Sequence, residues 1–281
     1  MTEYRERLKK AQRVVVKIGS ALLTDNGKGL NQPLMRSWAA QLAELMDQGK
    51  QVVLVSSGAV AEGVVRKGFC ERPTTLAELQ AAAALGQSGL VEAWQNAFEG
   101  KGKQTAQILL VHDDVVSDSR YQNAKATLNT LLDWGVVPVV NENDTVANEE
   151  LKFGDNDSLA AIVANIVKAD VLILLTDQEG MFDADPRKSK QAQLITESEA
   201  GDGSLLAMAG DGGKFGRGGM QSKVKAAELA SCAKADTVIA SGLVSNVVMR
   251  ILDGETLGTL LYSPEAGEEE RQAWFKALRQ G

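Results

Sequence analysis

Two lysines stand beside glycine-rich segments at points where predicted strands end and predicted helices begin. Lys17 directly follows the apolar run Val14–Val16, and Lys223 follows the segment Gly216–Gly219. Ser57–Gly58 follows a second apolar run in the same way. Glycine-loop amides, helix N-termini and lysine ammonium groups are the groups with which proteins bind phosphate. The residue types and their positions therefore predict a site that handles phosphate.

Acids and amides occupy two further turns. The segment Asn141–Asp144 (NEND) follows a buried-type strand, where a simple turn explains it poorly and a functional loop explains it better. The segment Asp155–Asp157 (DND) precedes a helical stretch, so one of its three residues is needed as the helix cap. The remaining two are either a local turn cluster or functional groups, and the residues alone leave both interpretations open.

The phosphate-handling residues also have structural interpretations. Lys17 either reaches water from a strand end or, after three valines, needs a phosphate or carboxylate to compensate its charge; the second is favoured. Ser56–Gly58, taken alone, fits an ordinary strand-to-helix turn with a serine cap. Gly216–Lys223 is either a flexible hinge or a helix start that binds an anion, and the lysine in its first turn favours the anion site.

Several familiar chemistries are excluded. His112 is the only histidine, so a histidine metal pair is excluded and a Ser-His-Asp triad is largely excluded, because we interpret His112 as structural. Gly213–Lys214 is followed by Phe215 rather than Ser or Thr, so the chain has no P-loop, and no GxGxxG follows the first strand. Cys70 and Cys232 are too few and too far apart for a disulfide framework or a CxxC metal site.

The elements that must position these residues alternate along the chain. Strands are predicted over the apolar runs 13–17, 52–55, 108–111, 136–140, 171–175, 237–240 and 257–261. Helices are predicted over 31–49, with Asn31 as cap and Pro33 in the first turn, and over 118–135, 158–169 and 220–235. Trp38, Trp94 and Trp134 are interpreted as core or interface residues on helix faces.

This alternation predicts an α/β fold, a three-layer αβα sandwich around a largely parallel sheet. Ligands of such sheets bind at the carboxyl ends of the strands, which brings the loops above to one edge. The irregular stretch 177–217 after the fifth strand is interpreted as a functional excursion.

Composition and charge further limit the class of protein to which this chain can belong. The 281 residues are 44% hydrophobic and 24% charged, which is ordinary for a globular chain. The net charge of −7 argues against a general nucleic-acid binder. The first ten residues are charged rather than apolar, and no apolar run approaches the roughly 18 residues that span a bilayer. We therefore expect no signal peptide, no membrane partner and a cytoplasmic protein.

Taken together, the loops resemble the amino-acid kinase family, and within it the kinases that phosphorylate glutamate. The resemblance rests on six blocks spread over most of the chain: VVVKIGSALLT (14–24), VSSGAVAEG (55–63), PVVNENDTVA (138–147), FGDNDSLAA (153–161), LLTDQEGMFDADPR (174–187) and GRGGMQSK (216–223). The NEND and GDND blocks are the specific ones, because kinases of the family for aspartate, carbamate or uridylate share the lysine-glycine start but lack them.

The resemblance implies a central eight-stranded sheet, ATP with Mg²⁺, and transfer of the γ-phosphate to the side-chain carboxylate of L-glutamate. The product would be L-glutamyl 5-phosphate, the first intermediate of proline biosynthesis. It further implies a homo-oligomer, feedback inhibition by L-proline, and glutamate-5-semialdehyde dehydrogenase as a transient partner. No nucleic-acid partner is implied.

Carried over by position, the resemblance assigns roles to individual residues. Lys17 and Lys223 match lysines that grip the transferring phosphoryl group, and Asp157 matches the acid that orients them. The matched glutamate-binding positions are Ser57, Asp144 and Asn156, with Asn141 beside them. The matched nucleotide-binding positions are Lys17, Gly19, Gly58, Thr176, Asp177, Arg217, Gly218, Gly219, Met220, Gln221, Ser222 and Lys223. No residue is assigned to bind a metal directly.

Two departures from the family pattern stand out. Relatives commonly carry threonine where this chain has Arg217, so the role of Arg217 is open: a contact to a nucleotide phosphate, or none. Many bacterial relatives continue into a C-terminal PUA domain, and the sequence does not include one. We expect a kinase domain over residues 1–263 and a helical tail over 264–281.

Overall fold

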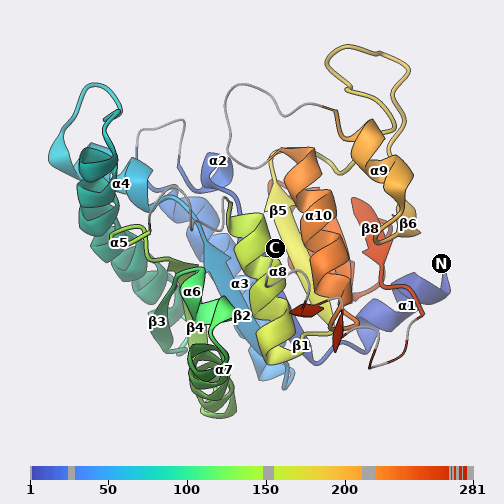
Figure 1. Cartoon of the computed structure of the whole chain (residues 1–281), viewed down its shortest axis with the longest axis horizontal. Coiled ribbons are helices and arrows are strands. Elements are labelled where there is room, and N and C mark those ends of the chain that lie inside the picture. Colours follow the sequence, from blue (N-terminus) through green and yellow to red (C-terminus); the bar gives the residue numbers. More distant parts are fainter. Residues whose placement is uncertain are drawn as a thin grey trace.

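An eight-stranded sheet forms the centre of the fold (Figure 1). The computed structural model describes residues 2–24, 29–147, 155–210 and 219–265, together with residues 267, 269, 272, 273, 275 and 276. The strand order is β3-β4-β2-β1-β5-β7-β8-β6, and every pair is parallel except β7 with β8. The strands are β1 (Arg13–Ile18), β2 (Gln51–Ser56), β3 (Thr105–Leu110), β4 (Val137–Glu142), β5 (Val171–Thr176), β6 (Glu197–Glu199), β7 (Asp236–Ser241) and β8 (Thr259–Tyr262). The predicted largely parallel sheet is confirmed.

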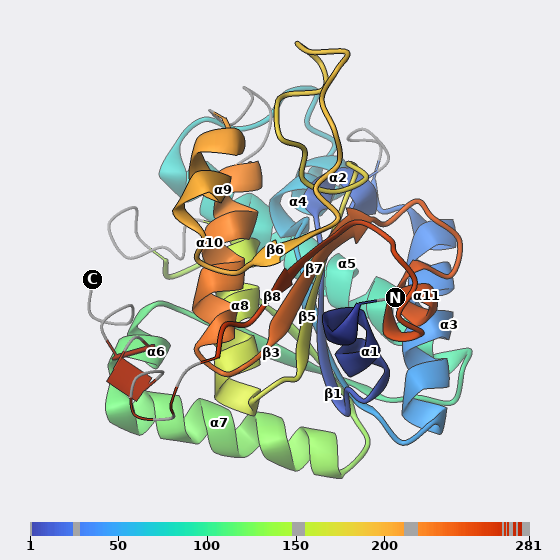
Figure 2. The same ribbon diagram turned by 90° about the vertical axis from the view of Figure 1, so that its right-hand side faces the viewer.

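Helices cover both faces of this sheet (Figure 2). They are α1 (Glu3–Lys9), α2 (Ser20–Leu23), α3 (Gln32–Asp47), α4 (Ala59–Lys67), α5 (Leu76–Glu99), α6 (Asp113–Val116), α7 (Asp118–Asp133), α8 (Asn156–Val167), α9 (Gly203–Met208), α10 (Met220–Ser231) and α11 (Val247–Leu252). Buried side chains of α3, α5 and α11 pack against one face of the sheet, and those of α7, α8 and α10 against the other. The three-layer αβα sandwich is confirmed.

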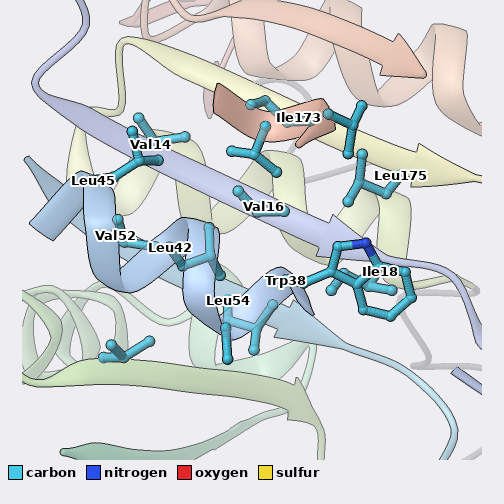
Figure 3. Packing of buried hydrophobic residues seen from close by; sticks show 14 of the residues in the cluster. Val14, Val16, Ile18, Trp38, Leu42, Leu45, Val52, Leu54, Ile173 and Leu175 are labelled. Carbon is cyan, nitrogen blue, oxygen red and sulfur yellow. The ribbon is translucent and has the colours of Figure 1, made fainter. Parts of the chain in front are cut away.

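The side chains of the central strand β1 alternate between the two faces of the sheet. Val14, Val16 and Ile18 lie in the apolar cluster that includes Trp38 of α3 (Figure 3). Val15 lies in the cluster on the opposite face, with α8. Because side chains alternate along a strand, Lys17 emerges on the same face as Val15, toward α8.

The helix starts follow the caps that the sequence predicts. The side chain of Asn31 accepts a hydrogen bond from the Leu34 N–H at the start of α3, where Pro33 occupies the first turn. Asp155 caps α8 by accepting from the Ser158 N–H. One member of the DND segment is thus the cap, which leaves Asn156 and Asp157 for other contacts.

Other features of the sequence led to incomplete or wrong expectations. β6 was not predicted because it has only three residues, and its sequence Glu-Ser-Glu has no apolar pattern. Trp38 and Trp94 are buried as expected, but Trp134 is 72% exposed at the end of α7 and is not a core residue. The stretch after β5 contains β6 and α9, and its first part projects beyond the carboxyl end of the sheet (Figure 2).

The described residues contain no helix that is both long and apolar enough to cross a bilayer. The division into a domain over 1–263 and a tail over 264–281 stays a prediction.

Candidate functional site

Two lysines from distant elements meet at one buried carboxylate. The ammonium group of Lys17, at the end of β1, lies 2.5 Å from Oδ1 of Asp157 in the first turn of α8. The ammonium group of Lys223, in the first turn of α10, lies 2.9 Å from Oδ2 of the same residue. All three side chains are buried, and α8 and α10 pack side by side over the sheet (Figure 1). The structure therefore brings together the three residues predicted to be catalytic.

Burial and neighbouring charges shift the pKa values of Lys17 and Asp157. Burial lowers the pKa of Lys17, and the neighbouring Asp157 carboxylate offsets only part of that effect. Burial alone would raise the pKa of Asp157, but the charges and hydrogen bonds of Lys17 and Lys223 hold it below the usual 3.8. The triad by itself carries one net positive charge, which favours an anionic ligand at this point, and the Asp155 carboxylate, whose charge also acts on Lys17, offsets part of it.

We expect the free energy of unfolding to fall in acid as Asp157 takes up a proton. Its pKa is lower in the folded chain than the unfolded 3.8, so its contribution is present above pH 3.8 and is lost as the pH falls through the folded pKa. Asp155 has the opposite effect on the free energy of unfolding. Because burial raises its pKa in the folded chain, its protonation in acid favours the folded state.

Urea unfolding between pH 3 and 6 measures this dependence, and a carbon-13 titration of the carboxyl groups assigns it. An Asp157 midpoint above 3.8, or stability that is unchanged across this range, would contradict the expectation.

Three helices at the carboxyl edge of the sheet begin with glycines as their caps. Gly19 precedes α2, Gly58 precedes α4 and Gly219 precedes α10, and none has a side-chain cap among the described residues. Gly58 adopts a φ of 102°, a left-handed conformation that favours glycine. Uncapped helix starts present free backbone N–H groups, which attract phosphate.

The start of α10 is tied directly to the triad. The hydroxyl of Ser222 lies 2.8 Å from Oδ2 of Asp157 and 2.7 Å from the carbonyl oxygen of Gly219. Met220 and Gln221 lie half-buried in the same turn. The predicted residues Arg217 and Gly218 lie outside the described residues.

The end of β5 holds the other predicted nucleotide residues. Thr176 pairs with Ser241 of β7, and its hydroxyl donates to the carboxylate of Asp177 at 3.0 Å. Asp177 is exposed. Both stand at the carboxyl edge of the sheet, at the end of the strand adjacent to β1.

Amide and hydroxyl side chains cluster at the ends of β2 and β4. Nδ2 of Asn156 donates to Ser57 Oγ at 2.8 Å and to Asn141 Oδ1 at 2.9 Å. Asn141 in turn donates to Oε1 of Gln87 on α5 at 2.9 Å. The structure therefore joins three of the predicted glutamate-binding residues in one network. Gln87 was missed because the sequence around it, Ala-Ala-Ala-Ala-Leu-Gly-Gln, carries no motif of a site.

Asp144 lies in the turn that follows β4. It is half-buried, and the turn is anchored by the Asn143 N–H, which donates to the carbonyl of Leu110 at the end of β3. The turn thus stands beside Asn141 at the same edge of the sheet. The structure places all four predicted glutamate-binding residues along this edge.

The donor set fits a magnesium-bound nucleoside triphosphate and an anionic acceptor. Two buried ammonium groups and uncapped helix starts suit a triphosphate, while hydroxyl, amide and carboxylate groups beside them suit an amino acid. Among the described residues, no group of three or more His, Cys, Asp or Glu side chains could hold a metal ion by itself.

Known proteins resemble this chain over most of its length. Residues 12–241 match the amino acid kinase family. The glutamate 5-kinase of Pseudomonas savastanoi pv. phaseolicola is 58% identical over 267 residues, which make up 94% of this chain and 72% of that protein. The glutamate 5-kinase of Saccharophagus degradans is 53% identical over 271 residues, or 96% of this chain and 73% of that protein.

A solved structure supports the fold independently. The UMP kinase of Bacillus anthracis superposes with a TM-score of 0.62 and 18% sequence identity, over 91% of this chain and 97% of that one. At this identity the likeness concerns the fold alone.

Proposed function

This chain belongs to the amino acid kinase family, and from that premise we propose that it catalyses the glutamate 5-kinase reaction. The γ-phosphoryl group of ATP passes to the side-chain carboxylate of L-glutamate, giving L-glutamyl 5-phosphate and ADP, the first step of proline biosynthesis. The observation that carries this proposal beyond sequence identity is the buried Lys17–Asp157–Lys223 triad, which concentrates positive charge at the carboxyl edge of the sheet.

The reaction suits a site without a catalytic base. The γ-carboxylate of glutamate has an ordinary pKa near 4.3, so it is already an anion at neutral pH. In the transfer, the bond between the γ-phosphorus and its bridging oxygen breaks, a carboxylate oxygen bonds to that phosphorus, and ADP leaves. No proton moves in this step. The barrier comes from repulsion between the anionic acceptor and the phosphates, which positioning and positive charge reduce.

The chain's own residues divide this work. Lys17 and Lys223 would hold the transferring group from two sides, and Asp157 fixes both ammonium groups at one place. The N–H groups at the starts of α2, α4 and α10 would bind phosphate oxygens. When bound, Mg²⁺ neutralises part of the phosphate charge. Separate loops for donor and acceptor allow the approach along one axis that the transfer needs.

The acceptor side would recognise an amino acid. Ser57, Asn141 and Asn156 supply hydroxyl and amide groups for a carboxylate, and Asp144 supplies a charge that pairs with an ammonium group. The nucleotide would lie toward Thr176, Asp177 and the start of α10, with Arg217 and Gly218 as sequence neighbours of that start.

A substrate panel tests the proposal. The chain is incubated with ATP, Mg²⁺ and hydroxylamine, which traps an acyl phosphate as its hydroxamate, with L-glutamate, L-aspartate, carbamate or UMP as acceptor. ADP release is followed in parallel. We expect hydroxamate and ADP to form together with glutamate, and far less ADP with the other three. Binding of ATP and glutamate without turnover would indicate a sensor on this fold and overturn the proposal.

The pH dependence of kcat tests the mechanism without a base. We expect no limb near pH 6.5, because no histidine titration is required. We expect an alkaline limb below pH 10.5, since burial lowers the pKa of Lys17 and kcat falls as its ammonium group loses a proton. Initial rates at saturating substrates from pH 5.5 to 10 measure both limbs. A limb near pH 6.5 that disappears in His112→Ala would contradict the mechanism.

Four properties of the proposed enzyme follow from the same resemblance. It acts as a homo-oligomer in the cytoplasm, L-proline inhibits it, and glutamate-5-semialdehyde dehydrogenase is its transient partner. Light scattering of the purified chain tests the assembly, and the hydroxamate assay with added proline tests the inhibition.

A further inference from the structure

A chain of hydrogen bonds runs from α5 to the candidate glutamate site. Gln87 Oε1 accepts from Asn141 Nδ2 at 2.9 Å, and Asn141 Oδ1 accepts from Asn156 Nδ2 at 2.9 Å. Asn156 Nδ2 also donates to Ser57 Oγ at 2.8 Å. A carboxamide has one accepting end and one donating end, so the acceptor at Gln87 fixes which end Asn141 turns toward Asn156. The orientation of each amide thus depends on the one before it.

Stability alone does not account for an amide at position 87. Gln87 is only 9% exposed, and its Nε2 has no hydrogen-bond partner among the described residues. A buried donor without a partner destabilises a fold, so it offsets part of the stability that the hydrogen bond from Asn141 contributes. The part of the side chain that is used is its acceptor oxygen, and the group it serves is Asn141.

The helix that carries Gln87 is locked to the turn that carries Ser57. A methyl group added to Gly86 would lie 1.8 Å from the carbonyl oxygen of Ala59, the first residue of α4. One added to Gly63 would lie 1.7 Å from the carbonyl oxygen of Ala82. Trp94 of α5 also donates to Ser56 Oγ at 2.8 Å. One end of the hydrogen-bonded chain therefore stands on α5, and the other stands in the turn directly before α4, the helix packed tightly against it.

We propose that Gln87 is a positioning residue, which sets the orientation of the Asn141 and Asn156 carboxamides at the glutamate site. The inference rests on the proposed function, because it assigns those amides to the acceptor substrate. Gln87 contacts Asn141 of the candidate glutamate site, so we expect its effect to fall on glutamate rather than on ATP.

The test compares two buried glutamines that receive the same substitution. Gln87→Met keeps the volume and removes the acceptor. Gln41→Met is the control: Gln41 is 4% exposed and accepts from the Val248 N–H at 2.9 Å, between α3 and α11 and away from the site. We expect Gln87→Met to raise the KM for glutamate about tenfold, the effect of losing one hydrogen bond to a buried group. The KM for ATP should change by less than about twofold, and both variants should lower the melting temperature to a similar extent.

A double-variant cycle separates positioning from a general loss of structure. If Gln87 acts through Asn141, Gln87→Met adds almost nothing to the glutamate KM of Asn141→Ala. Additive effects of the two substitutions, equal changes in both KM values, or a glutamate KM for Gln87→Met that matches Gln41→Met would each overturn the proposal. Should Gln87→Met fail to fold, Gln87→Leu replaces it with the same expectation. An inactive wild-type chain would overturn the proposed function itself, whereas an active wild type with an unaffected Gln87→Met overturns the positioning role alone.

Discussion

Lys17→Ala is expected to lower kcat for glutamate phosphorylation by about 10²–10³, the usual loss when a charged contact to the developing transition state is removed. Lys223→Ala is expected to do the same. Each ammonium group reaches one oxygen of Asp157, so removing either lysine leaves that carboxylate paired with the other. Neither variant creates an unpaired buried charge, and the fold should therefore survive while turnover does not.

A lysine outside the site provides the control for these variants. Lys50 is half-buried, and its ammonium group donates to the carbonyl of Ala11, ahead of β1. Lys50→Ala should keep kcat within about twofold, because the lost group lies far from the carboxyl edge of the sheet. Steady-state rates measure the loss of turnover in all three variants, and circular-dichroism melts show whether each variant keeps its fold. Near wild-type turnover in both Lys17→Ala and Lys223→Ala would remove these lysines from the phosphoryl site.

The sequence predicts the sheet better than it predicts the helices beside it. Runs such as Val52–Val55 and Val171–Leu175 are short and apolar at consecutive positions, which is typical of strands buried on both faces. The hairpin of α4 and α5 has no comparable signal. Its contacts rest on glycines such as Gly63 and Gly86, whose importance lies in a close backbone approach that becomes visible only in three dimensions.

The same distinction applies to the candidate site. Lys17 can be predicted from the sequence, because a lysine after three valines needs a partner for its charge. In the structure this partner is the carboxylate of Asp157 on α8. Asn156 and Asp157 can also be predicted, because the start of a helix needs only one cap residue and three polar residues stand there. Gln87 has no such signal, since one amide in an alanine-rich helix looks like a surface residue until the fold buries it beside Asn141.

Asp144→Ala should raise the KM for glutamate at least about 30-fold, because a buried ammonium that loses its partner is penalised by about 2–5 kcal/mol. An acid at this position distinguishes an amino acid from the many dicarboxylates that a carboxylate-binding site alone would accept. The KM for ATP should change little, since Asp144 follows β4, whereas Thr176 and Asp177 stand at the end of β5, beyond β2 and β1 in the strand order.

A second carboxylate shows what a purely structural role would look like. Asp170 accepts from the backbone N–H groups of Gln12 and Arg13, at 2.8 and 2.9 Å, at the opposite end of the sheet. Asp170→Ala should lower the melting temperature and leave both KM values unchanged, because it removes turn contacts alone. If Asp144→Ala behaves in this way too, Asp144 only forms the turn after β4. A large rise in the glutamate KM with a small change in melting temperature assigns it instead to the substrate, where its charge decides which acids the site accepts.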